Sequence, residues 1–135
     1  MKQCRGCGSP LTKKSQQSFC SNKCQRASER VTKTQRWLET GQAPWVGSTR
    51  GHYIRQYLAA DQSGCCAICG KAAVWLELPL ALIIDHIDGD ASNNRRENLR
   101  LVCPNCDSQL PTFKARNWGK GRHFRRQRYA DGKSF

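Results

Sequence analysis

Residues 83–113 of this chain read IIDHIDGDASNNRRENLRLVCPNCDSQLPTF, and this stretch decides the fold. A β-rich run over 74–84 and a second apolar run over Leu99–Val102 predict two strands. The polar segment between them carries a glycine and an Asn-Asn pair, which are typical of loops. Pro104 suits the first position of a helix, and Pro111 would end or kink that helix. The order strand, loop, strand, helix predicts a small α+β unit.

The cysteines point to metal binding. Eight of the nine fall into the patterns CxxC-x33-CxxC and CxxC-x12-CxxxC, formed by Cys66, Cys69, Cys103 and Cys106 and by Cys4, Cys7, Cys20 and Cys24. A closed shell of four thiolates is typical of structural zinc. Nothing in the N-terminal residues looks like a secretory signal, and this favours metal over disulfides. We therefore expect two structural zinc ions, with Cys65 as a bystander unless it exchanges register with Cys66.

Two helices are expected outside this unit. Ser21 can cap a helix that runs to about Thr40 and stops at Gly41. One face of this helix has the periodicity of a buried side and consists of Ala27, Val31, Thr34 and Leu38. The neighbouring stripe either follows a nucleic-acid backbone or is simply solvated, and it consists of Arg26, Arg30, Lys33 and Trp37. A shorter helix is expected over 52–60, with three inward side chains, Ile54, Tyr57 and Leu58.

Charge indicates the class of partner. The chain has 135 residues and a formal net charge of +13. Lys and Arg outnumber acids nine to one in residues 1–36 and eight to one in 114–135, whereas residues 37–113 hold six against eight. Basic arms can neutralise phosphates, while central acids can hold a cation. Hydrophobic residues are only 38% of the chain, so the core is small and needs cross-links. We expect a nucleic-acid partner and no membrane span.

Three motifs stand close together in the stretch 83–113: Asp85-His86, Asn98-Leu99 and the segment Cys103-Pro104-Asn105-Cys106-Asp107. Together they resemble the HNH endonucleases, which have the ββα-metal active site. The zinc-knuckled bacterial and phage branch is the most similar, and the resemblance covers about residues 53–128. It includes IRQYL at 54–58 and GKGR at 119–122, and the FCSNKC knuckle at 19–24 also occurs in such proteins. The resemblance implies a zinc-stabilised ββα-metal core.

The resemblance also implies a role for each polar residue. His86 would be the general base that takes a proton from the attacking water, which imidazole can do near neutral pH. Asp85 and Asp107 would hold one catalytic Mg²⁺ or Mn²⁺ ion, because hard cations prefer carboxylate oxygens. Asn98 would brace the loop that orients the histidine. The activity implied is metal-dependent hydrolysis of DNA that leaves 5′-phosphate and 3′-hydroxyl ends.

One residue departs from the family pattern. Where the family usually has His or Asn, this chain has Asp107. The aspartate either shifts the preference towards oxygen-loving cations, or it over-binds the metal and slows or removes cleavage. Basic residues of the loop and tail are expected to contact the DNA backbone: Arg95, Arg96, Lys114, Arg116, Lys120, Arg122, His123, Arg125 and Arg126.

The expected organisation has four parts. Residues 1–40 would form a zinc knuckle and basic helix, 41–51 a linker, 52–113 the nuclease core and 114–135 a basic tail. Double-stranded DNA is the expected substrate, and cutting both strands would imply a homodimer. A cytoplasmic location in a bacterial or phage-infected cell is expected. Two alternatives share the same basic and cysteine features, namely a non-catalytic double-zinc DNA-binding protein and an RNA nuclease.

Overall fold

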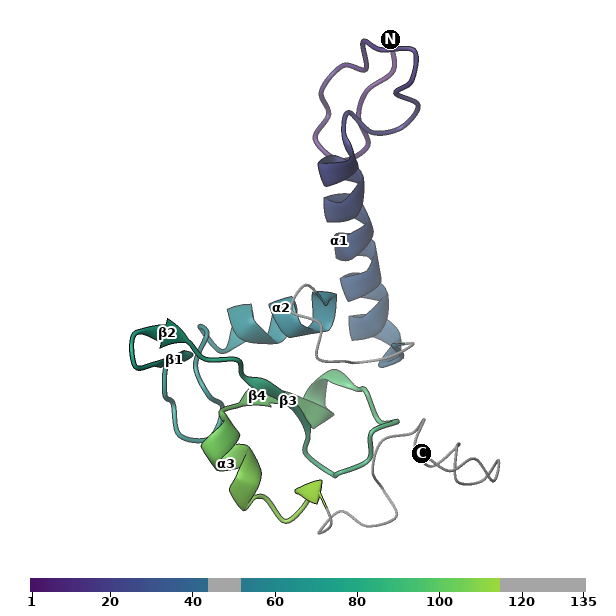
Figure 1. Cartoon of the computed structure of the whole chain (residues 1–135). Helices are drawn as coiled ribbons and strands as arrows, with labels where there is room; N and C mark the ends of the chain where they lie inside the picture. Colours follow the sequence, from purple (N-terminus) through teal and green to yellow (C-terminus); the bar gives the residue numbers. More distant parts are fainter. Residues whose placement is uncertain (44–51, 115–135) are drawn as a thin grey trace, which may run out of the picture.

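The computed structural model describes residues 1–43 and 52–114, which form an α+β arrangement of helices and two small sheets (Figure 1). An N-terminal knuckle leads into a long helix, α1 (Asn22–Thr40). The second helix, α2 (Tyr53–Asp61), contacts α1 and the later strand β4 (Leu99–Val102). None of the helices in these residues has the length and apolar character needed to cross a membrane. The helices and the two small sheets confirm the predicted α+β fold class.

The predicted strand, loop, strand and helix are present. Strand β3 (Ile83–His86) pairs antiparallel with β4 (Leu99–Val102), so that His86 lies opposite Leu99 at one end of the ladder. A single 3₁₀ turn, η1 (Arg96–Asn98), leads into β4. Helix α3 (Pro104–Gln109) follows, with Pro104 in its first turn. The helix ends at Gln109, and the next residue, Leu110, is extended because the residue before a proline disfavours helical geometry.

A short hairpin precedes this unit. Its strands are β1 (Val74–Trp75) and β2 (Leu78–Pro79), and both are exposed. The two linking residues, Leu76 and Glu77, have φ angles of 50° and 66°. A two-residue hairpin loop with positive φ at both positions usually contains Asn or Gly. The sequence therefore predicted β structure here but contained no signal for the turn.

Helix α2 covers the inner side of β4. His52 caps its first turn by accepting a hydrogen bond from the Ile54 N–H. Ile54 and Leu58 are fully buried, as predicted for the inward face. Together with three residues of β4 and four other buried side chains they form the core, which consists of Trp37, Ile54, Leu58, Cys66, Leu82, Leu99, Leu101, Val102 and Cys103. The small core agrees with the need for additional cross-links.

Helix α1 has the predicted caps but not the predicted buried face. The Ser21 side chain accepts from the Cys24 N–H, and Gly41 ends the helix with a φ of 67°. Val31 is 66% exposed and Leu38 is 42% exposed, whereas Trp37 is fully buried. The expected inward face was wrong because α1 extends away from the strands, so that only its C-terminal end packs on the core (Figure 1).

Candidate active site and metal centres

The structure brings each predicted set of four cysteines together. The sulfur atoms of Cys66, Cys69, Cys103 and Cys106 all lie within 4.8 Å of one another, and the same holds for Cys4, Cys7, Cys20 and Cys24. Backbone N–H groups point at two of these sulfurs, from Cys103 to Cys66 Sγ at 3.2 Å and from Cys20 to Cys4 Sγ at 3.3 Å. Each set could hold a metal ion, and four thiolates are compatible with tetrahedral zinc.

The thiol electrostatics fit a bound cation. A backbone N–H of Cys7, followed by that of Cys20, lowers the pKa of Cys4 to about 6. Burial alone would raise the pKa of Cys66, but backbone N–H groups of Cys69 and Cys103 outweigh it and lower that pKa to about 6. Conversely, burial and then the neighbouring thiols raise the pKa of Cys106 to about 12. Four thiolates cannot share such a site without a positive charge among them.

Cys65 lies outside this shell. Its thiol hydrogen-bonds to the carbonyl oxygen of Ser63 at 3.5 Å, and its backbone forms a bridge with Ala72. Cys66, the next residue, is the one whose sulfur joins the set of four. The structure therefore places Cys65 beside this set of four sulfurs and outside it.

His86 ends β3 with one ring nitrogen in a defined contact. Its Nε2 lies 2.8 Å from the Oδ1 of Asn94, which is 9% exposed. An amide oxygen can only accept, so His86 Nε2 carries the proton in this contact. The lone pair of the neutral imidazole is then on Nδ1. This is the tautomer that a general base acting through Nδ1 requires.

Asn94 is a site residue that the sequence did not indicate. In the sequence it is only the second residue of an Asn-Asn pair that is typical of loops. Its own main-chain carbonyl accepts a hydrogen bond from the indole Nε1 of Trp37 at 2.6 Å. Trp37 belongs to α1, 57 positions earlier in the chain. No spacing rule connects a helix tryptophan with a loop asparagine at that distance, so only the folded chain shows the contact.

Asn98 fastens the loop that follows His86. Its Nδ2 donates to Asp88 Oδ1 at 2.9 Å and to the carbonyl of Asn93 at 2.8 Å. Its Oδ1 accepts from the backbone N–H of Asp88 at 3.0 Å. Hydrogen bonds from Asn93 and then from the backbone of Asp90 and from Asn98 lower the pKa of Asp88. Asp88 is thus a charged anchor of the loop, and Asn98 has the contacts expected of a brace.

Asp85 and Asp107 lie close enough to influence each other. Asp85 is 7% exposed and accepts from Arg100 Nε at 2.8 Å, across the β3–β4 pair. Asp107 is in the first turn of α3, which packs on β3. Burial and then the Asp85 charge raise the pKa of Asp107, while Lys114 opposes the shift. Two carboxylates that repel in this way fit a site for one divalent cation, whose remaining positions waters can fill.

The predicted DNA-contacting residues differ in their surroundings. Arg95 is exposed, whereas Arg96 is paired with the Asp61 carboxylate and lies over the Tyr57 ring at 5.4 Å. Lys114 is close enough to Asp107 to affect its titration. The other six predicted residues lie outside the described part of the chain: Arg116, Lys120, Arg122, His123, Arg125 and Arg126.

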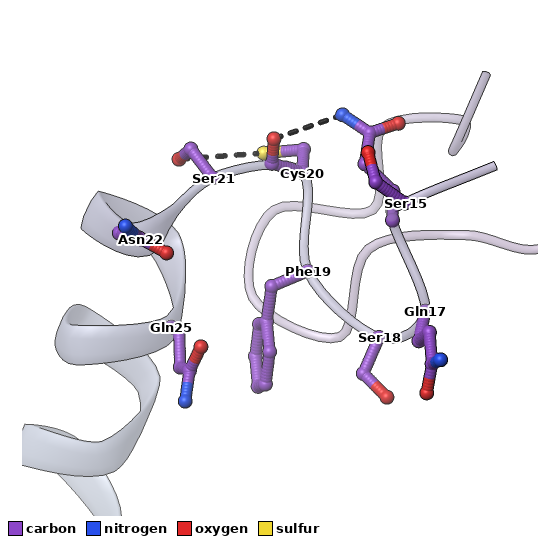
Figure 2. A pocket seen from close by; sticks show the side chains of 9 residues that line it. Ser15, Gln17, Ser18, Phe19, Cys20, Ser21, Asn22 and Gln25 are labelled. Carbon is purple, nitrogen blue, oxygen red and sulfur yellow. Dashed lines mark hydrogen bonds between the residues drawn. The ribbon is translucent and has the colours of Figure 1, made fainter. Parts of the chain in front are cut away.

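A polar hollow of about 460 Å³ lies beside the N-terminal knuckle, far along the chain from His86 (Figure 2). Its wall combines one aromatic ring, Phe19, with hydroxyl and amide side chains such as Ser18 and Gln25. Of the predicted site residues only Cys20 lines it. It is therefore separate from the carboxylates and the histidine.

Known proteins match part of this chain, including the segment that contains Asp85, His86 and Asn98. The model of a family described as HNH endonuclease matches residues 77–105. Over 55 residues the chain is 42% identical to the H-N-H endonuclease F-TflIV of Escherichia phage T5. The matched segment makes up 41% of this chain and 24% of that relative, so the chain spans about a quarter of the relative's length. No solved structure matches the chain.

Proposed function

We propose that this chain, which carries the HNH endonuclease motif at residues 77–105, is a metal-dependent endonuclease that hydrolyses DNA. One observation carries the proposal. The motif histidine, His86, ends β3 with its Nε2 2.8 Å from the Oδ1 of the buried Asn94, and it directly follows the buried Asp85 in the strand. A DNA-binding module would have no need of a histidine with its basic nitrogen defined in this way.

His86 acts as the general base of a one-step hydrolysis. Its Nδ1 takes a proton from water as the water oxygen forms a bond to phosphorus. The bond between phosphorus and the 3′ oxygen breaks, and that oxygen leaves and receives a proton from solvent. The phosphate stays bonded to the 5′ oxygen of the nucleotide downstream of the break, so the products carry 5′-phosphate and 3′-hydroxyl ends. No cysteine is required as a nucleophile.

Asp85 and Asp107 hold the catalytic divalent ion, which is Mg²⁺ or Mn²⁺. When bound, this ion supplies positive charge for the scissile phosphate and the departing oxygen. Arg100 orients Asp85 through the 2.8 Å contact to Oδ2. The two sets of four cysteines hold structural zinc, because a closed thiolate shell leaves no position open for substrate.

Double-stranded DNA is the proposed substrate. The net charge of +13 supports a polyanionic partner, and Arg95 and Lys114 provide cations near the loop and near Asp107. A single site of this kind cuts one strand. Cleavage of both strands therefore requires a second copy of the chain or a second binding event.

A plasmid assay tests the function. Supercoiled plasmid incubated with the protein and Mg²⁺ or Mn²⁺ should become nicked or linear, and EDTA should prevent this. The ends should be substrates for ligase without prior phosphorylation, as 5′-phosphate and 3′-hydroxyl termini are. Single-stranded RNA is included as a competing substrate. Absence of cleavage with every metal would support a purely DNA-binding protein, and cleavage of RNA alone would support an RNA nuclease.

Asp107 gives a separate test of the metal site. Asp107→Ala removes one of two metal-holding carboxylates, so cleavage should fall by about 10²-fold or more while zinc content stays unchanged. Asp107→Asn keeps an oxygen ligand of the type usual in the family and should retain measurable cleavage. Gln109→Ala, an exposed change in the same helix, is the control. If Asp107→Ala cleaves like the wild type, this residue does not hold the catalytic ion.

A further inference from the structure

The C-terminal end of α1 contacts two consecutive residues, Asn94 and Arg95, of the loop that follows β3. The indole N–H of Trp37 donates to the carbonyl oxygen of Asn94 at 2.6 Å. Gly41 lies against Arg95 so closely that a Cβ at position 41 would be 2.7 Å from Arg95 Cγ. Trp37 and Gly41, the residue that caps α1, both precede the segment that matches the family, which begins at residue 77. The helix after the N-terminal knuckle is therefore docked on the loop of the site.

Asn94 has two contacts that lead in different directions. Its carbonyl oxygen accepts from Trp37, and its side-chain Oδ1 lies 2.8 Å from His86 Nε2. Trp37 is fully buried and Asn94 is 9% exposed, so water does not compete strongly at either contact. A hydrogen bond to the carbonyl oxygen fixes the Asn94 backbone, and with it the point from which the side chain reaches His86. The three residues form one short hydrogen-bonded chain.

We propose that Trp37 is a positioning residue for His86: by holding the Asn94 backbone it keeps Asn94 Oδ1 on His86 Nε2–H and so directs Nδ1 towards the substrate. The inference rests on the proposed function, in which His86 is the general base. Its consequence is that the N-terminal helix contributes to catalysis, in addition to any contact with DNA.

Packing alone does not account for the tryptophan. Its ring meets Tyr57 edge to face, with centroids 5.4 Å apart, and a phenylalanine could make a similar contact. What tryptophan adds is the N–H, whose donor is satisfied by Asn94 and which would be costly to bury without a partner. The indole N–H is thus the feature that a test must remove.

Trp37→Phe removes the N–H and keeps an aromatic ring. The single-turnover cleavage rate should fall about tenfold, as expected for loss of one hydrogen bond that orients a catalytic group, while DNA affinity and zinc content stay at wild-type values. Trp75→Phe is the matched control, because Trp75 is half exposed on β1 and should change nothing. Nitrogen-15 NMR of the full protein reports the His86 tautomer independently of activity. It should change from mainly Nε2–H to a mixture in Trp37→Phe only.

Asn94 supplies a second pair of variants. Asn94→Leu removes the acceptor and should lower the cleavage rate and mix the tautomers, whereas Asn94→Asp keeps an acceptor oxygen and should retain the Nε2–H form. Two results in Trp37→Phe would overturn the proposal: a wild-type cleavage rate with a wild-type His86 tautomer, or a loss that is confined to DNA affinity.

The proposed function and the positioning role can fail separately. If the wild-type protein does not cleave DNA at all, the proposed function fails. If the His86 tautomer is unchanged in both Trp37→Phe and Asn94→Leu, the positioning role fails.

Discussion

His86→Ala should lower the rate of metal-dependent plasmid cleavage by about 10²–10⁴-fold, the usual contribution of a general base. The residue is half-buried at the end of β3, and its Nε2 contact to Asn94 leaves Nδ1 as the basic nitrogen. DNA affinity measured in EDTA, thermal stability and zinc content should stay near wild-type values. This pattern would separate a catalytic loss from a folding defect.

The other histidine in the described residues provides a matched control. His52 caps α2, and Asn is also a favoured cap, so His52→Asn should fold and cleave like the wild type. Persistent cleavage in His86→Ala at more than about a tenth of the wild-type rate would contradict the general-base role. Equal losses in both variants would indicate that the assay measures stability and not chemistry.

Cys66→Ser should release one zinc ion per chain and abolish cooperative folding of the strands and α3. Cys66 is 3% exposed, and its sulfur accepts from the Cys103 N–H where β4 meets α3. Structural zinc contributes about 10–16 kcal/mol of apparent binding free energy, which is comparable to the whole stability of a small domain, about 5–15 kcal/mol. Circular dichroism against temperature and metal analysis by mass spectrometry measure both effects.

The preceding residue gives the control for this change. Cys65 lies outside the set of four sulfurs, so Cys65→Ser should keep two zinc ions and shift the free energy of unfolding by less than about 0.5 kcal/mol. If Cys66→Ser keeps both ions and Cys65→Ser loses one, the two residues exchange roles. If neither variant loses metal, the cluster of Cys66, Cys69, Cys103 and Cys106 does not bind zinc.

Local patterns were sufficient for the secondary structure near the site. Ser21 and Gly41 mark the ends of α1, and Pro104 starts α3, because caps and prolines act on the backbone of their own residues. The cysteine spacings likewise identified both sets of four, since a CxxC turn needs only local geometry. The tight turn at Leu76 and Glu77 was not predictable, because neither residue normally favours positive φ.

Contacts between distant segments were beyond these patterns. Helical periodicity placed Val31 and Leu38 on one face of α1, but it could not say that only the end of the helix meets the core. The pairing of Asp85 with Arg100 depends on the register of β3 and β4, which the strands set together. Arg96 is predicted to contact DNA, and its ion pair with Asp61 joins it to another element that the sequence pattern does not indicate.

The sequence by itself determined the chemical groups of this protein: eight cysteines in two ligand patterns, an Asp-His pair, Asn98 and the basic ends. The tertiary structure decided how those groups are held. It selected Asn94 as the partner of His86 Nε2 and brought Trp37 to the Asn94 carbonyl. The physical reason is that ligand spacing and backbone capping act within a few residues. In contrast, the tautomer and direction of a catalytic imidazole depend on buried hydrogen bonds between segments that meet only when the chain folds.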